Sequence, residues 1–225
     1  MADAATQTLA YYAARAPHYD AVYTKPERRR DITHLATWLP TCFRGRTVLE
    51  VACGTGFWTQ FIAPATASMV ATDLTAEPLA LARARSNVAN VRFERVDANA
   101  LPAQLGEFDG AFAGLWFSHV PIERRRAFLD GLHARLRHGA RVVMIDNSAV
   151  QCRELPITET DARGNTYQQR RLPDGSVHRV LKNFPTQAEL LALVAPCATD
   201  VQYRDLDNFW LLEYTLAGPV SGAPA

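Results

Sequence analysis

The chain has 225 residues, of which 48% are hydrophobic and 21% charged, which fits one soluble α/β domain and leaves too little for two of ordinary size. A net charge of +1 gives no long-range attraction to nucleic acid or to an anionic membrane surface, and no apolar run is long enough to cross a bilayer. We therefore expect a cytoplasmic protein without nucleic-acid or membrane partners, whose four widely spaced cysteines are reduced.

The first 150 residues alternate between helical and extended patterns. Residues 7–39 have helical patterns, so we assign residues 1–40 to a helical lid and residues 45–150 to a ligand-binding core. Strands are predicted at 47–52, 68–74, 91–97, 108–117 and 140–147, and helices between them at 57–63, 76–88 and 121–139. Such alternation predicts a doubly wound α/β sheet of parallel strands with helices on both faces.

After residue 150 the pattern changes. A turn signal, PDG at 173–175, separates two extended segments and predicts a β-hairpin, so we assign residues 151–184 to an inserted flap over the acceptor side of the ligand cleft. In residues 185–217 we expect a helix at 186–196, begun by a capping box of Thr186 and Glu189, and a closing antiparallel strand pair at 201–206 and 209–216. Residues 218–225 are expected to be a frayed tail of this single domain, 1–225.

The first predicted strand leads directly into a loop of small residues, ACGTG at 52–56. Such a loop needs glycines where it approaches a ligand, because glycine adopts positive φ and has no Cβ in the ligand's way. The next two predicted strands end in Asp73 and Asp97. A carboxylate at the end of the second strand can accept two hydrogen bonds from a ribose diol, and Asp97 can accept one from an amine such as adenine N6. The pattern therefore predicts a nucleoside ligand.

Two kinds of nucleoside ligand compete for this loop. A dinucleotide site has the pattern G-x-G-x-x-G, but Thr59 occupies the third glycine position here, after the bulky Phe57 and Trp58. Glu50, inside the first strand, would repel a pyrophosphate but could hold an ammonium group directly or through water. An adenosine that carries an amino acid therefore fits better than one that carries phosphates.

The segments VLEVACGTG, ATDL, VDANALP and FDGAFAGLWFSHV resemble the successive motifs of class I S-adenosylmethionine-dependent methyltransferases of the small-molecule type. The resemblance implies a Rossmann-like sheet of seven strands with the last one antiparallel, S-adenosylmethionine as cofactor and S-adenosylhomocysteine as product. It also implies the residues that hold the cofactor: Tyr12, Tyr19, Glu50, Ala52, Gly54, Gly56, Trp58, Asp73, Leu74, Asp97, Ala98 and Leu115. For the two lid tyrosines, simple packing within the lid is an equally open interpretation.

The region after the fourth predicted strand indicates the acceptor class. Relatives that methylate base amines have a [DNS]PP[YF] stretch there, whereas this chain has GLWFSHVP, and its charge is near neutral, so we expect a small-molecule acceptor. His119 is the candidate catalytic residue, to take or orient a proton from an O–H or N–H group, although it could instead stack on or cap the following helix. Candidate substrate contacts are Trp116, Asn147, Tyr167 and Lys182.

Methyl transfer to an oxygen or nitrogen atom of a small molecule is the main prediction, with no metal site and with a monomer or homodimer as the expected assembly. Two alternatives stay open. One is a regulatory protein that binds the cofactor without turnover. The other is a nicotinamide-dependent oxidoreductase, which Phe57, Trp58 and Glu50 disfavour.

Overall fold

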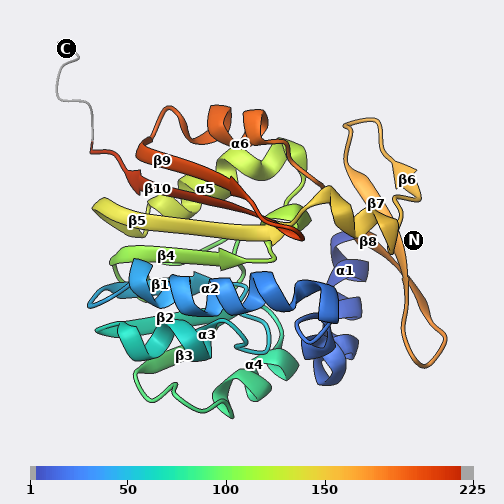
Figure 1. The fold of residues 1–225 in the computed structure, drawn as a ribbon, viewed down its shortest axis with the longest axis horizontal. Helices are drawn as coiled ribbons and strands as arrows, with labels where there is room; N and C mark the ends of the chain where they lie inside the picture. Colours follow the sequence, from blue (N-terminus) through green and yellow to red (C-terminus); the bar gives the residue numbers. More distant parts are fainter. Residues whose placement is uncertain (1–3, 219–225) are drawn as a thin grey trace.

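One seven-stranded sheet organises the computed structural model, which describes residues 4–218. Its strands are β1 (Thr47–Val51), β2 (Ser68–Asp73), β3 (Val91–Arg95), β4 (Phe108–Gly114), β5 (Leu136–Asn147), β9 (Ala198–Asp205) and β10 (Phe209–Leu216). They lie in the order β3-β2-β1-β4-β5-β10-β9, and β10 runs antiparallel to both of its neighbours (Figure 1). The predicted seven-stranded, doubly wound sheet with an antiparallel last strand is confirmed.

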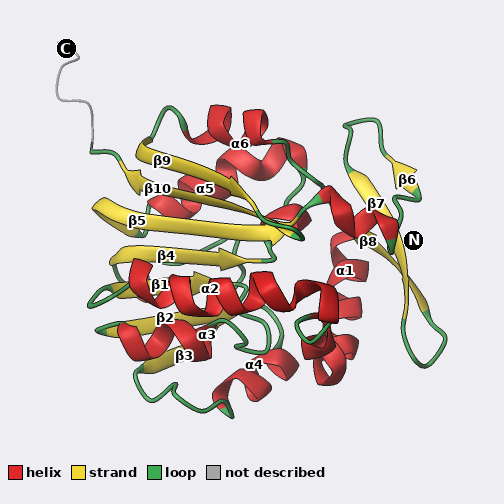
Figure 2. Ribbon diagram, in the orientation of Figure 1, coloured by secondary structure: helices red, strands yellow, loops and turns green. Residues whose placement is uncertain are grey.

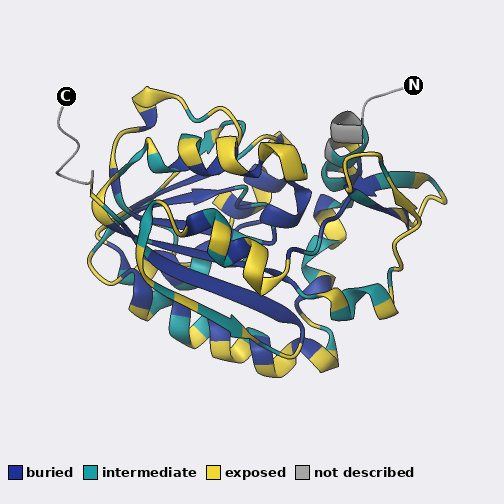
Figure 3. Ribbon diagram, turned by 90° about the horizontal axis from the view of Figure 1, so that it is seen from above, coloured by how far each residue is buried: buried dark blue, intermediate teal, exposed yellow. Residues whose placement is uncertain are grey.

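Helices cover both faces of this sheet (Figure 1). They are α2 (Arg29–Cys42), α3 (Thr59–Ile62), α4 (Ala76–Arg83), α5 (Arg125–His133) and α6 (Gln187–Val194), whereas α1 (Ala4–Arg15) lies beyond the carboxyl ends of the strands. Leu39 of α2 and Ile62 of α3 pack into a core on one face, while Phe128 of α5 and Val194 of α6 pack into a core on the other. Figure 3 shows the sheet buried between helices that each expose one side to solvent, as amphipathic helices on an α/β sheet do.

A second, smaller sheet and the N-terminal helices lie beyond the carboxyl ends of the main strands (Figure 2). The small sheet comprises β6 (Glu159–Thr160), β7 (Thr166–Arg171) and β8 (Val177–Leu181), all antiparallel. The predicted hairpin is therefore present and has one further strand. Helix α1 packs on β8 through Tyr11, which forms a buried cluster with Leu172 and Val180. The lid and the flap thus form one layer at the edge of the sheet where ligands bind in such folds.

Several predicted boundaries are wrong, and the clearest case is the helix expected to end at Gly139. Helix α5 ends at His133, and β5 begins at Leu136, which pairs with Phe108 of β4. Gly139 adopts a φ of +80° in the stretch where the register between β4 and β5 shifts. Its left-handed backbone therefore serves an irregularity within the strand rather than a helix end. The fourth strand and the helix at 76–88 also end earlier, at Gly114 and Arg83.

The predicted capping box of Thr186 and Glu189 is confirmed at the start of α6. The predicted tail at 218–225 lies outside the described residues except for Gly218.

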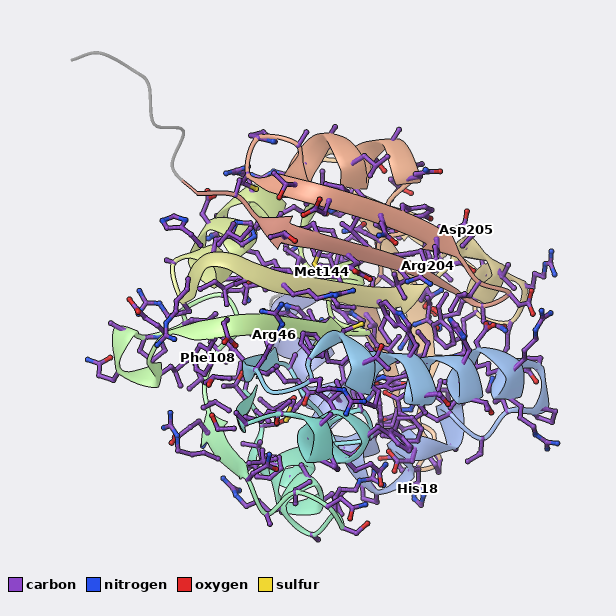
Figure 4. The ribbon with its side chains drawn as sticks, turned by 60° about the vertical axis from the view of Figure 1, so that its left-hand side comes forward. His18, Arg46, Phe108, Met144, Arg204 and Asp205 are labelled. Carbon is purple, nitrogen blue, oxygen red and sulfur yellow. The ribbon has the colours of Figure 1, made fainter. Side chains whose placement is uncertain are left out.

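The open edge at β9 is charged. Arg204 and Asp205 lie along this edge, whereas Met144 lies within the sheet (Figure 4). The guanidinium of Arg204 lies over the ring of Trp38, 4.6 Å from its centre, and 3.6 Å from a carboxylate oxygen of Glu213. Charged side chains on an edge strand oppose pairing with another chain.

Gly56 generates a first prediction about stability. Its φ is +73°, and a Cβ added there would lie 2.9 Å from the Cβ of Ala82 in α4. Gly54 also has a positive φ, +55°, but a Cβ there would meet nothing within 4 Å. Both alanine variants bring left-handed strain of about 1–2 kcal/mol, and only Gly56→Ala must also displace α4, at about 1–3 kcal/mol more. Urea unfolding should therefore show the larger loss for Gly56→Ala. Equal losses would show that the loop does not pack on α4 in this way.

Candidate active site

A cavity of about 850 Å³ opens at the carboxyl ends of β1, β2 and β4, between the lid and the flap. Loop residues that follow these strands form its floor, α1 and the 3-10 helix η1 (Ala16–Val22) one wall, and the flap another. The sequence-predicted site residues that line it are Tyr12, Tyr19, Ala52, Gly54, Asp73, Leu74, Asp97, Ala98, Leu115, Trp116, His119 and Tyr167. Most residues chosen from widely separated motifs therefore meet at one cavity.

The remaining predicted site residues lie outside the lining of this cavity: Glu50, Gly56, Trp58, Asn147 and Lys182. Glu50 is buried beneath the loop and accepts a hydrogen bond from the Thr59 hydroxyl at 2.6 Å. Trp58 packs edge-on against Tyr23 within the core, so it stabilises the lid rather than reaching the cavity. Lys182 is buried on Asp146 behind the cavity wall.

Asp73 fastens the glycine loop to the end of β2. One carboxylate oxygen accepts the backbone N–H of Gly54 at 3.0 Å, and the other accepts the backbone N–H and the hydroxyl of Thr75 at 2.9 and 2.7 Å. A carboxylate has about four lone-pair positions, of which three are used here, so this one can still accept about one hydrogen bond from a ligand in the cavity that it lines.

Two residues at the cavity floor have left-handed backbones although neither is glycine. Ala52, after β1, has a φ of +51°, and Leu115, after β4, has a φ of +58°. Strands β1 and β4 are neighbours, so the two turns lie side by side. Each such residue costs on the order of 1–3 kcal/mol, and such strain concentrates at functional sites. Here it turns two chains sharply away from the sheet and exposes their backbones to the cavity.

The lid is fastened to the core by a polar contact that no sequence motif revealed. Asp20 of η1 accepts a hydrogen bond from the Thr55 hydroxyl at 2.6 Å and forms an ion pair with Arg85. The Nε of Arg85 donates to the Thr55 carbonyl at 2.9 Å, so three segments far apart in sequence meet there. Tyr23 adds a stacked contact with Phe57, with ring centres 3.7 Å apart.

His119 has a defined tautomer. Its Nδ1 lies 2.6 Å from the carbonyl oxygen of Leu181, which only accepts, so Nδ1 carries a proton. Burial and the nearby Lys182 ammonium hold the pKa of His119 well below its usual value, so the ring is neutral and Nε2 is an acceptor. Nε2 lies 2.9 Å from the hydroxyl of Tyr12, which donates to it and in turn accepts from Arg170 at 2.9 Å. A neutral imidazole with an accepting nitrogen at a cavity can remove a proton from a ligand.

Sequence reasoning missed Asp146, which the structure places next to His119. It is fully buried at the end of β5, where it accepts the backbone N–H of Ser118 at 2.8 Å and lies 2.9 Å from the Lys182 ammonium. Burial alone would raise the pKa of Asp146, but the Lys182 charge holds it below its usual range, while burial lowers the pKa of Lys182 to about 8. An acid near the end of the apolar run RVVMIDN was the available signal.

Among the residues that the structure describes, no set of three or more His, Cys, Asp or Glu side chains is arranged to hold a metal ion. Within residues 4–218, none of the helices combines the length and the apolar character that a membrane span requires.

Comparison with known proteins gives the same family as the motifs. A family of methyltransferase domains matches residues 48–139. The uncharacterized methyltransferase sll0829 of Synechocystis sp. is 30% identical over 102 residues, which cover 45% of this chain and 47% of that protein. An uncharacterized protein of Mycobacterium tuberculosis, Rv1403c, is 36% identical over 101 residues, which cover 44% and 36%. The chain therefore matches less than half the length of these two relatives.

Solved structures match over nearly the whole chain. DhpI in complex with SAH is 26% identical with a TM-score of 0.78, covering 96% of this chain and 98% of that one. The N-methyltransferase NodS from Bradyrhizobium japonicum, in complex with S-adenosyl-L-homocysteine, shares the fold at 14% identity and a TM-score of 0.66, covering 95% and 99%.

The fold and the cavity define an α/β protein with a nucleoside-type site at the carboxyl ends of its parallel strands. Residues 48–139 match a family of methyltransferase domains, and nearly the whole chain shares its fold with DhpI, which was solved in complex with SAH and with SAM.

Glu50 generates a second prediction. Burial, and to a smaller extent the Asp73 charge, raise its pKa to about 8. The folded protein thus keeps a proton that the unfolded chain loses above its ordinary pKa of about 4.5, so stability falls as the pH rises from about 5 to 8. Glu50→Gln removes this loss and should raise the free energy of unfolding by about 1–3 kcal/mol at pH 8, with a smaller gain at pH 5.

Thermal unfolding across this pH range measures the effect, with Glu77→Gln on the exposed side of α4 as the control. Parallel curves for Glu50→Gln and the wild type would show that Glu50 is ionised in the folded protein.

Proposed function

We propose that this protein transfers a methyl group from S-adenosylmethionine to an oxygen or nitrogen atom of a small-molecule acceptor. The observation that carries the proposal is the neutral His119 imidazole, whose accepting Nε2 faces the same cavity as the glycine loop and Asp73. Relatives support it, since DhpI was solved with SAH and with SAM and HEP, and NodS is an N-methyltransferase.

The cavity fits the cofactor in three respects. Gly54 leaves open space where a Cβ would point, so a ligand can approach the loop backbone. Asp73 has about one lone-pair position left for a ribose hydroxyl, and Leu74, Asp97 and Ala98 line the part of the cavity where we place adenine. Glu50 would receive the amino group directly or through water, and a nearby ammonium would favour its charged form. When bound, the cofactor supplies an electrophilic methyl group on sulfur.

The residues of this chain then have two tasks. Proximity is the larger one, because holding acceptor and methyl group in line can supply about 7–11 kcal/mol of the barrier. The lid and the flap enclose the cavity and so provide this positioning. The second task is proton removal, in which Nε2 of His119 takes the acceptor proton, either directly or through the Tyr12 hydroxyl.

The assignment of a small acceptor is supported by the shape of the site. Flap residues between Asp161 and Tyr167 and residues of α1 both line the cavity, so two walls limit the space that an acceptor can occupy. Tyr167 and Trp116 also line it, and we propose that they contact the acceptor. The hairpin tip at 173–176 does not line the cavity, so specificity would depend on the base of the flap.

A third prediction tests the cofactor. Asp73→Asn keeps the size of the side chain but removes its charge and one acceptor, so binding of S-adenosylhomocysteine should weaken about 10- to 100-fold, as for loss of a charge-assisted hydrogen bond. The matched control is Asp109→Asn, because Asp109 also caps a backbone N–H, that of Thr47 at 2.7 Å, but at the start of the strands. Isothermal calorimetry measures both. Absence of binding by the wild type, or equal binding by Asp73→Asn, would contradict the cofactor assignment.

A fourth prediction tests the base. His119→Asn retains an N–H donor for the Leu181 carbonyl but has no group in place of Nε2. We expect kcat to fall 10²- to 10⁴-fold, with affinity for S-adenosylhomocysteine within about twofold of wild type. Turnover is measured with radiolabelled S-adenosylmethionine and a panel of small hydroxy acids, phenols and amines.

The panel also separates the alternatives. Cofactor binding without methylation of any acceptor would favour a regulatory protein, and full activity of His119→Asn would remove His119 from the chemistry.

A further inference from the structure

The buried pair of Lys182 and Asp146 lies directly behind His119 and outside the cavity lining. The ammonium donates to the Ser118 hydroxyl at 2.5 Å and to Oδ1 of Asp146 at 2.9 Å, and both charged side chains are at most 1% exposed. We call Lys182, Asp146 and Ser118 the clamp. Because the Lys182–Asp146 pair lies outside the cavity lining, we do not expect it to contact a ligand, and we ask instead which segments of the chain it connects.

The clamp joins the two segments that meet at the imidazole. Ser118 immediately precedes His119, and Lys182 immediately follows Leu181, whose carbonyl accepts from Nδ1. Two backbone contacts complete the joint: Asp146 accepts the N–H of Ser118 at 2.8 Å, and Asn183 donates its N–H to the Ser118 carbonyl at 2.8 Å. The positions of the imidazole and of its acceptor therefore depend on the same few bonds.

A buried ion pair is a poor way to gain stability, because desolvation of both charges can exceed their attraction and a packed apolar pair is often as stable. An apolar pair would not, however, direct a particular backbone N–H and hydroxyl as Asp146 and Lys182 do. The pair therefore fixes the positions of the Ser118 N–H and hydroxyl, and adds little to the free energy of unfolding.

We propose that Lys182, held on Asp146 and Ser118, is a positioning residue that keeps His119 in the Nδ1–H tautomer with Nε2 free to accept a proton. The inference deepens the proposed function, on which the assignment of His119 as base rests, while the tautomer itself does not depend on any acceptor. The flap thus contributes to the catalytic apparatus as well as to enclosure of the cavity.

The charges around His119 support this role. Tyr12 on α1, Arg170 on β7, Lys182 after β8 and Asp146 on β5 are the titratable groups whose contacts or charges act on its ring. The Lys182 and Arg170 charges lower the pKa of His119, and the Asp146 charge raises it. Loss of Lys182 should therefore move the pKa of His119 upward and favour protonation of Nε2.

Nitrogen NMR of the histidine side chains tests the tautomer without an acceptor, with the His119 signals assigned by their loss in His119→Asn. We expect wild type to show one tautomer, protonated at Nδ1. In Lys182→Met, and in Lys182→Met/Asp146→Asn, which leaves no unpaired buried charge, we expect a mixture with protonation at Nε2. Arg141→Met is the control, because Arg141 also lies on β5 but forms its ion pair with Glu213 of β10, away from His119.

Kinetics give a second readout that a purely structural role would not change. In Lys182→Met the acid limb of the kcat/KM profile should move to higher pH, and kcat should fall at least tenfold at pH 7 while affinity for S-adenosylhomocysteine stays within about twofold. A wild-type His119 protonated at Nε2, or an unchanged tautomer in folded Lys182 variants, would overturn the proposal. The wild-type result can overturn the proposal even if both variants fail to fold. A shifted tautomer in a protein that methylates no acceptor would contradict the proposed function and leave the positioning role intact.

Discussion

The hydrogen bond from Nδ1 of His119 to the Leu181 carbonyl is the contact on which the site depends. It connects the turn after β4, which belongs to the main sheet, to the end of β8, which belongs to the flap. The ion pair of Lys182 with Asp146 and the hydrogen bond from the Asn183 N–H to the Ser118 carbonyl join the same two parts beside it. With it, Nδ1 is occupied as a donor, and Nε2 accepts from the Tyr12 hydroxyl at the cavity. The local geometry of the cavity's proton acceptor therefore follows from a contact between distant parts of the chain.

The site also places polar groups where burial opposes their charge. Glu50 is 2% exposed, and burial raises its pKa to about 8, while burial lowers the pKa of Lys182 to about 8 beside Asp146. Ala52 and Leu115 add backbone strain at the floor of the same cavity. Such features reduce stability and are retained where a ligand or a reaction requires them. Their concentration around one cavity is an argument for function that is independent of any motif.

The fold was largely predictable from sequence because local patterns determine it. Period-2 and period-3.6 hydrophobicity placed the sheet and its helices, and Thr186 with Glu189 marked a helix start. The end of α5 was not predictable, because Gly139 suits a helix terminus and a strand irregularity equally well, and pairing of Leu136 with Phe108 decided between them. Helix signals are local, whereas strand pairing is not.

The candidate site likewise has residues that the sequence predicts and contacts that it does not. Gly54, Asp73 and Asp97 follow strands in one pattern, so their meeting at the cavity could be predicted from the rule that parallel strands present their carboxyl ends at one edge. The contact of Asp20 with Arg85, and of Asp146 with Lys182, joins residues far apart in sequence with no spacing that links them. Sequence therefore indicated which ligand the floor would hold, but not how the lid and the flap are fastened above it.

A crystal structure with S-adenosylhomocysteine would show where the cofactor lies relative to His119. We expect adenine beside Asp97 and Ala98, the ribose on Asp73, and the sulfur atom between Leu115 and Tyr12, on the side of the cavity where Nε2 of His119 lies. Acceptor space should remain between that sulfur and residues 161–167 of the flap. Density for the ligand elsewhere, or a sulfur atom that faces away from His119 with no space for an acceptor, would contradict the account.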